Sequence, residues 1–167
     1  MITKKELAKT IDHTYLKIQG NDMEIKAICY EAIYYGFASV AVHPTIVPLA
    51  SKLLRDTPVK VCAALSFFSG RYPLEIKLYE IKDAISNGAT ELDMAMSVDF
   101  VKEKKYDLLE KELKEFVKVG KGLTTKVILE TCLLTREEKI KACEIAKSCG
   151  INFVKTSTGF KEGGATV

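Results

Sequence analysis

The feature that most constrains the fold is the alternation of short apolar clusters with longer segments of helical periodicity. Short apolar clusters bounded by turn residues predict buried strands, and apolar residues at helical spacing predict amphipathic helices. The expected strands are 10–12, 38–42, 60–65, 91–95, 126–129 and 153–155, and the expected helices are 22–35, 46–54, 73–86, 106–119 and 136–149. A helix before each next strand is the pattern of an α/β protein with a parallel sheet.

Turn and capping residues support these boundaries. Thr135 followed by Glu138 forms a capping box for the last helix. A left-handed glycine that ends a helix is expected at four positions, Gly36, Gly88, Gly120 and Gly150. Because no linker-like or low-complexity stretch interrupts the pattern, we expect a single domain over residues 1–167.

Charge and cysteine content limit the classes of binding partner and the cellular compartment expected for the protein. Twenty-five basic and 22 acidic residues leave a net charge of +3, which gives no reason to expect nucleic acid or a membrane surface as partner. The five cysteines are odd in number and lack CxxC spacing, so we expect reduced core residues of a cytoplasmic protein. The sequence contains no signal-peptide core and no apolar run that could span a membrane.

Two architectures fit repeated βα units. A (β/α)8 barrel typically takes about 250 residues, so length alone favours an open doubly wound sheet. An open nucleotide-binding sheet would usually carry a glycine-rich phosphate turn after its first strand, whereas this chain has HTYLKIQGN there. The sequence therefore provides no evidence of a nucleotide-binding site for the open-sheet alternative.

Polar side chains gather where the predicted strands end: Asp12, His13, His43, Asp93, Glu130 and Lys155. In both architectures ligands bind at the carboxyl ends of the strands. Lys155 follows three residues expected to be buried, and a desolvated lysine amine can attack a carbonyl to form a Schiff base. The alternative is that the strand ends one residue earlier and Lys155 reaches solvent.

Two further residues have roles that the pattern leaves open. Asp93 could move protons at a Schiff base formed by Lys155, or it could form a structural ion pair. Lys126 is the partner of Asp93, a cation that favours the neutral amine of Lys155, or a solvated lysine at a strand start. Spacing does not rank these three readings.

The segment TSTGFKEGGAT after the last strand contains hydroxyls, glycines and Lys161. It could wrap a phosphate with backbone N–H groups, with Thr158 and Gly159 as binding residues, or it could be a plain mobile loop. His13 and His43 lack the spacing of a metal site and are expected to be hydrogen-bonded residues at strand ends.

Five segments together resemble the deoxyribose-phosphate aldolase family: IDHTYLK at 11–17, SVAVHP at 39–44, GATELDMAMS at 88–97, KVILET at 126–131 and FVKTSTGF at 153–160. The resemblance implies a TIM-barrel, metal- and cofactor-independent class I aldolase, a carbon–carbon lyase of deoxyribose phosphate catabolism. Such an enzyme reversibly cleaves 2-deoxy-D-ribose 5-phosphate to D-glyceraldehyde 3-phosphate and acetaldehyde.

Carried over by position, the resemblance makes Lys155 the Schiff-base lysine, Asp93 the proton-relay aspartate and Lys126 a lysine beside them. It also places Asp12 and Thr14 at the mouth of the site. The expected partners are a small phosphorylated sugar or aldehyde and further copies of the chain, without nucleic acid or membrane.

Two departures from the family pattern matter. SFFSG at 66–70 replaces a segment that usually resembles GFPxG, so a related Schiff-base aldolase with another aldehyde acceptor is an alternative. About six βα units are present, where a complete barrel has eight, and a second lysine and phosphate loops would follow. We therefore expect a C-terminal part that continues past Val167, a truncated non-catalytic fragment that forms oligomers, or association that covers the strand edges.

Overall fold

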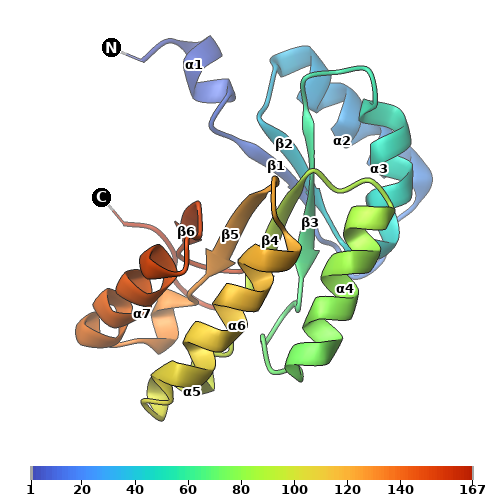
Figure 1. Cartoon of the computed structure of the whole chain (residues 1–167). Helices are drawn as coiled ribbons and strands as arrows, with labels where there is room; N and C mark the ends of the chain where they lie inside the picture. Colours follow the sequence, from blue (N-terminus) through green and yellow to red (C-terminus); the bar gives the residue numbers. More distant parts are fainter. Residues whose placement is uncertain (1, 167) are drawn as a thin grey trace. The chain divides into compact units, whose positions relative to one another are not determined.

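The structure of the chain is a computed structural model that describes residues 2–166. Its elements follow in the order α1 (Lys4–Ala8), β1 (Asp12–Tyr15), α2 (Asp22–Tyr35), β2 (Ser39–Val42), η1 (Pro44–Ile46), α3 (Val47–Leu54), β3 (Lys60–Leu65), α4 (Leu74–Ser86), β4 (Glu91–Ala95), α5 (Val98–Lys102), α6 (Tyr106–Val119), β5 (Thr124–Ile128), η2 (Thr131–Leu133), α7 (Arg136–Ser148) and β6 (Phe153–Lys155) (Figure 1).

The strands form a sheet in sequential order, β1-β2-β3-β4-β5-β6. Parallel pairing brings Asp12 opposite Ser39 between β1 and β2, and Ile128 opposite Lys155 between β5 and β6. Sequential parallel strands, with a helix between each strand and the next, are the topology of successive units of a TIM barrel rather than of a doubly wound sheet, whose strand order reverses.

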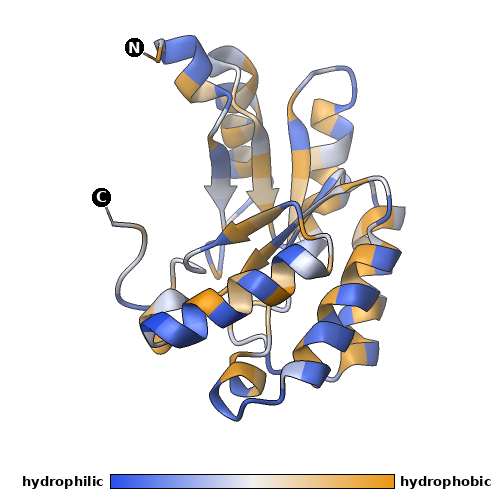
Figure 2. Ribbon diagram, turned by 60° about the vertical axis from the view of Figure 1, so that its left-hand side comes forward, coloured by the Kyte–Doolittle hydropathy of each residue, from blue (hydrophilic) through white to orange (hydrophobic). Residues whose placement is uncertain are grey.

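The chain divides into two compact units. The first runs to Ala64 and includes Asp83–Glu91, and the second contains Leu65–Lys82 and the chain from Leu92 onward. In the first unit, α2 and α3 pack together and against β2, around buried Cys29, Val40 and Val47. Figure 2 shows β1 mainly hydrophilic and its neighbour β2 hydrophobic, which matches the partial exposure of β1 and the complete burial of β2.

In the second unit, α6 packs beside α7, and α5 contacts both. Its core combines alternate residues of β4 with the apolar side of α6, namely Leu92, Met94, Leu109, Leu113 and Phe116. Because successive strand residues point to opposite faces, burial of Leu92 and Met94 against the helices directs Asp93 to the other face of the sheet.

The structure corrects the start of the first strand. The sequence predicted 10–12, but β1 is Asp12–Tyr15. Thr10 and Ile11 instead donate backbone hydrogen bonds to Leu7 and Ala8, in the turn that ends α1. Asp12 and His13 are therefore the first two residues of their strand, and their expected place at its carboxyl end is wrong.

Three smaller predictions are also wrong. β5 begins at Thr124 instead of Lys126, because the side chain of Asn152 accepts a hydrogen bond from the backbone of Thr125. Gly120 has φ −80°, although Gly36, Gly88 and Gly150 are left-handed as predicted. Phe153 and Val154, expected to be buried, are 59% and 46% exposed, because β6 is the last strand in the sheet order.

The cysteines follow the prediction in part. Within residues 2–166 all five are free thiols, and Cys29, Cys62 and Cys149 are buried. Cys132 is exposed, which contradicts its predicted place in the core. No helix in the described range is long and apolar enough to cross a membrane.

Candidate active site

Lys155 and Asp93 lie in direct contact. The Lys155 ammonium donates a hydrogen bond to Oδ2 of Asp93 and forms an ion pair with it. Asp93 is the third residue of β4 and Lys155 is the last residue of β6, so the contact reaches across β5. The Asp93 side chain is 2% exposed and that of Lys155 is 32% exposed. A buried carboxylate therefore holds an amine that solvent and a small ligand can reach.

Lys126 shares the sheet face of Lys155. The β5–β6 register pairs Lys126 with Phe153 and Ile128 with Lys155, so the two lysines are one strand apart and displaced by two residues. Lys126 is buried, as the third residue of β5. Of the three hypotheses for Lys126, the solvated lysine at a strand start is therefore wrong.

Glu130 anchors the segment after β6. This buried carboxylate accepts a hydrogen bond from the Thr158 hydroxyl at 2.5 Å, and the Thr158 backbone N–H lies 3.3 Å from Oε1. Glu130 has φ +54°, which turns the chain sharply after β5. Gly159, next in the segment, has φ +86°. The segment therefore has a fixed attachment point at Thr158.

Asp12 and Thr14 belong to the first unit. The Ser39 hydroxyl donates a hydrogen bond of 2.7 Å to Oδ1 of Asp12, and the Thr14 hydroxyl donates one of 2.9 Å to the Asp12 carbonyl oxygen. The Asp12 carboxylate thereby joins the amino ends of β1 and β2.

A pocket of about 310 Å³ opens within the second unit. It is lined by residues that follow β3, β4, β5 and β6, including Ser69, Arg71, Asp99, Glu130, Thr158 and Lys161. Its position at the carboxyl ends of the strands is where TIM-barrel enzymes bind their substrates. Besides hydroxyls, the lining carries two cations and two carboxylates, and Arg71 pairs with Asp99. The lining therefore suits a polar, hydroxylated ligand.

The loop after β3 gives this pocket an aromatic wall. Phe68 lines the pocket and meets Phe160 edge to face, with ring centroids 4.2 Å apart. The ring of Phe67 also lies near that of Phe160, with ring centroids 6.3 Å apart. The departure SFFSG therefore contributes directly to the shape of the candidate site.

Both histidines make hydrogen bonds, as predicted. His13 Nε2 lies 2.8 Å from Glu31 Oε2, and His43 Nε2 lies 3.3 Å from the Leu16 carbonyl oxygen. Among the described residues, no group of three or more His, Cys, Asp or Glu side chains could hold a metal ion.

Sequence reasoning missed two buried charged residues, Lys77 and Glu112. A signal for them exists. Lys77 stands on the buried stripe of α4 that continues with Ile81 and Ala84. Glu112 stands on the buried stripe of α6 between Leu109 and Phe116. A charged residue at an apolar stripe position indicates a buried polar contact.

Comparison with known proteins decides the family. The model of the DeoC/LacD family aldolases matches residues 6–167. The chain belongs to this family. A protein from Clostridium perfringens (strain SM101 / Type A) named deoxyribose-phosphate aldolase is 52% identical over 164 residues, which are 98% of this chain and 73% of that protein.

Solved structures agree with this assignment. A crystal structure from Coccidioides immitis, provisionally named a deoxyribose-phosphate aldolase, superposes with a TM-score of 0.96 at 38% identity, covering 99% of this chain and 65% of that one. The deoxyribose phosphate aldolase of Aeropyrum pernix, described as a tetramer, gives 0.88 at 31% identity, covering 95% and 67%. The family resemblance and the barrel topology with about six βα units are thereby confirmed.

Proposed function

We propose that the chain is a class I aldolase that reversibly cleaves 2-deoxy-D-ribose 5-phosphate to D-glyceraldehyde 3-phosphate and acetaldehyde through an imine on Lys155. The observation that carries this proposal is the contact between the partly exposed Lys155 amine and the buried Asp93 carboxylate. Family membership and the names of the relatives support the substrate.

In the direction of synthesis, Lys155 first transfers a proton to Asp93, the carboxylate it contacts. The neutral amine adds to the carbonyl carbon of acetaldehyde to give the carbinolamine. Protonated Asp93 returns its proton to the carbinolamine hydroxyl, which leaves as water, so that the iminium ion and the Asp93 carboxylate result. Asp93, acting directly or through a water molecule, takes a methyl proton, and the C–H electron pair forms the enamine.

The enamine carbon then attacks the aldehyde carbon of glyceraldehyde 3-phosphate. A carbon–carbon bond forms, the aldehyde oxygen takes up a proton, and the iminium ion is restored. Water adds to the iminium carbon, the C–N bond breaks, and Lys155 is free again. The reverse sequence cleaves the sugar phosphate.

The remaining site residues receive supporting roles. We assign Lys126 as the second cation on the same face of the sheet. Thr158, which lines the pocket of the second unit, and its neighbour Gly159 are assigned as contacts of the substrate. Substrate contacts of Asp12 and Thr14 stay a prediction of the family resemblance alone, and Asp12 lies at the amino end of β1. Burial of Lys126 and attachment of Thr158 to Glu130 support these assignments.

Borohydride trapping with acetaldehyde tests the central step. Reduction of the imine should leave an N-ethyl group on the peptide that carries Lys155, and Lys155→Ala should abolish it. Lys147→Ala, which removes an exposed lysine of α7, is the matched control and should trap normally. Modification no greater than that of surface lysines would rule out catalysis by this chain and favour the reading as a non-catalytic fragment.

The aromatic loop after β3 favours a second candidate, a Schiff-base aldolase of the same mechanism with a different acceptor. Phe68 offers an apolar surface beside the cations of the pocket. Product analysis with phosphorylated and free aldehydes separates the candidates. Preference for the phosphorylated acceptor supports the first, and preference for an apolar aldehyde supports the second.

We further propose that the chain acts in the cytoplasm as a homo-oligomer. Exposure of apolar Phe153 and Val154 on the last strand of the sheet order supports self-association. The tetramer described for the Aeropyrum pernix relative supports an oligomer of some kind.

A further inference from the structure

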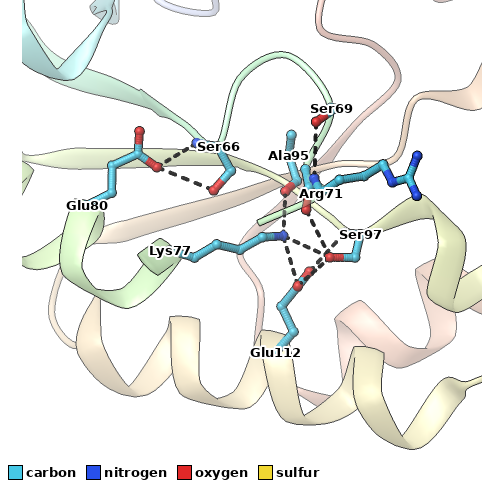
Figure 3. A network of polar contacts seen from close by, with 9 residues as sticks. Ser66, Ser69, Arg71, Lys77, Glu80, Ala95, Ser97 and Glu112 are labelled. Carbon is cyan, nitrogen blue, oxygen red and sulfur yellow. Dashed lines mark hydrogen bonds and ion pairs between the residues drawn. The ribbon is translucent and has the colours of Figure 1, made fainter. Parts of the chain in front are cut away.

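Lys77 is a completely buried lysine that the proposed reaction does not use. Its ammonium donates to Oε2 of Glu112 at 2.8 Å, to the Ser97 hydroxyl at 3.1 Å and to the Ala95 carbonyl oxygen at 3.2 Å (Figure 3). These three acceptors match the three protons of an ammonium group. Burial lowers the pKa of Lys77, and the charge of Glu112 opposes that shift.

Ser97 extends this network to the loop after β3. Its backbone N–H donates to Oε1 of Glu112 at 3.0 Å. Its hydroxyl lies 2.7 Å from Oε2 of Glu112 and 3.0 Å from the Gly70 carbonyl oxygen. Through Ser97, residues of α4 and α6 hold both the end of β4 and the loop that contains Gly70. We call Lys77, Ser97 and Glu112 the Lys77 network.

The segments held by the network form one wall of the pocket. Phe68 and Ser69 precede Gly70, Arg71 follows it, and all three line the cavity. On the β4 side, Ala95 and Asp99 line it as well, and Arg71 pairs with Asp99 at 2.8 Å. The network thus contacts the segments that form this wall, and the Arg71–Asp99 ion pair links the loop after β3 to α5.

The loop after β3 and the segment after β4 approach too closely for a side chain between them. A Cβ atom at Gly70 would lie 2.0 Å from the Met96 carbonyl oxygen. Glu80, one turn after Lys77 on α4, also accepts a hydrogen bond of 2.7 Å from the backbone of Ser66 at the start of the loop. Several independent contacts therefore fix this loop in one position.

Stability alone is a weak reason for such a network. A buried ion pair often contributes no more to folding than apolar residues of similar volume would. The network also fixes directions in space, since an ammonium with three fixed acceptors allows one arrangement of the Ala95 carbonyl and of the Ser97 and Glu112 side chains that it binds.

We propose that Lys77 is a positioning residue that acts through Ser97 and the carbonyl groups of Ala95 and Gly70. It holds the pocket wall against which the aldehyde acceptor binds, and it takes no part in imine formation at Lys155. This inference rests on the proposed aldolase function and deepens it by separating acceptor binding from donor activation.

The test measures the two half-reactions separately. Lys77→Met should raise KM for 2-deoxy-D-ribose 5-phosphate about ten- to a hundredfold, because displaced binding groups cost that much in enzymes. Trapping of acetaldehyde on Lys155 should stay within about twofold of the wild type. Ser97→Ala, which keeps the charged pair, should raise KM in the same direction by a smaller factor.

A double variant distinguishes positioning from mere stability. Lys77→Met with Glu112→Met removes both buried charges, so it should recover much of the stability lost in Lys77→Met. KM should nevertheless stay raised, because the Ala95 carbonyl group and the Ser97 hydroxyl, which holds Gly70, still lack the Lys77 ammonium. Leu113→Ala, a core change on the same helix as Glu112, should lower stability with KM unchanged.

Two results would overturn the inference. Both apply if the wild type traps acetaldehyde and cleaves the sugar phosphate. The first result is an unchanged KM in both Lys77→Met and Ser97→Ala. The other is a KM that returns to normal together with stability in the double variant. A wild type that neither traps acetaldehyde nor cleaves the sugar phosphate would instead reject the proposed function, and the positioning role with it.

Discussion

At the scale of single residues, the proposed chemistry depends on one carboxylate within reach of one amine. Asp93→Asn keeps the size of the side chain but removes the group that accepts the proton of Lys155. We expect kcat for sugar phosphate cleavage to fall by about 10²- to 10⁴-fold, the usual contribution of a general acid–base group. Steady-state kinetics measure this, with the exposed Asp107→Asn as control. Loss of less than about threefold would contradict the proton-transfer role.

The buried thiol of Cys29 predicts a pH dependence of folding stability. Desolvation raises its pKa from 9.0 to about 11. Below pH 9 the thiol is protonated in both states. Between pH 9 and 11 only the unfolded state loses the proton, so the free energy of unfolding should fall with rising pH, by about 2 to 3 kcal/mol in all.

Urea unfolding at about pH 8 and pH 10.5 measures this effect. Cys29→Ala should lose stability overall but show a smaller decrease between the two pH values. Cys132→Ala, which changes an exposed cysteine, should keep the wild-type pH dependence. Equal slopes for Cys29→Ala and the wild type would show that other groups cause the decrease.

At the scale of elements, two glycines separate backbone strain from steric conflict. Gly70 and Gly122 have φ +65° and +88°. A Cβ atom at Gly122 meets nothing within 4 Å, whereas one at Gly70 lies 2.0 Å from the Met96 carbonyl oxygen. Gly122→Ala should therefore cost about 1 to 2 kcal/mol for the left-handed backbone alone.

Gly70→Ala should cost about 3 kcal/mol or more, because the loop must also move away from the end of β4. Chemical denaturation measures the loss in free energy of unfolding for both variants. The difference between the two losses is the cost of the steric conflict at Gly70. Equal costs for the two substitutions would show that the loop relaxes freely, which would also weaken the proposed role of Lys77.

At the scale of the whole molecule, the exposed side chains of β6 are a candidate surface for self-association. β6 pairs with β5 along one edge, its other edge has no strand partner among residues 2–166, and Phe153 is 59% exposed. Such an edge favours association. Sedimentation velocity should show self-association that increases with concentration.

Phe153→Glu should shift this equilibrium toward the monomer by placing charge on the exposed face of the edge strand. Ile18→Glu, at an exposed loop position of the first unit, should leave it unchanged. Similar sedimentation of both variants and the wild type would exclude the exposed face of β6 as an interface.

Local pattern determined the strand and helix sequence, the capping box at Thr135 and the placing of Asp93 and Lys155 on strands. These features depend on residues a few positions apart, which periodicity can detect. The start of β1 was predicted wrongly, because Ile11 is apolar like a strand residue but its backbone N–H belongs to the turn after α1.

Only the tertiary structure decided the contacts that make the site. Asp93 and Lys155 meet across 62 positions of sequence, and Lys77 and Glu112 across 35. Burial of Lys77 likewise depends on acceptors supplied by β4 and α6. A single sequence records which residues carry charge, but distance and desolvation decide which of those charges meet, and both arise only when the strands and helices pack.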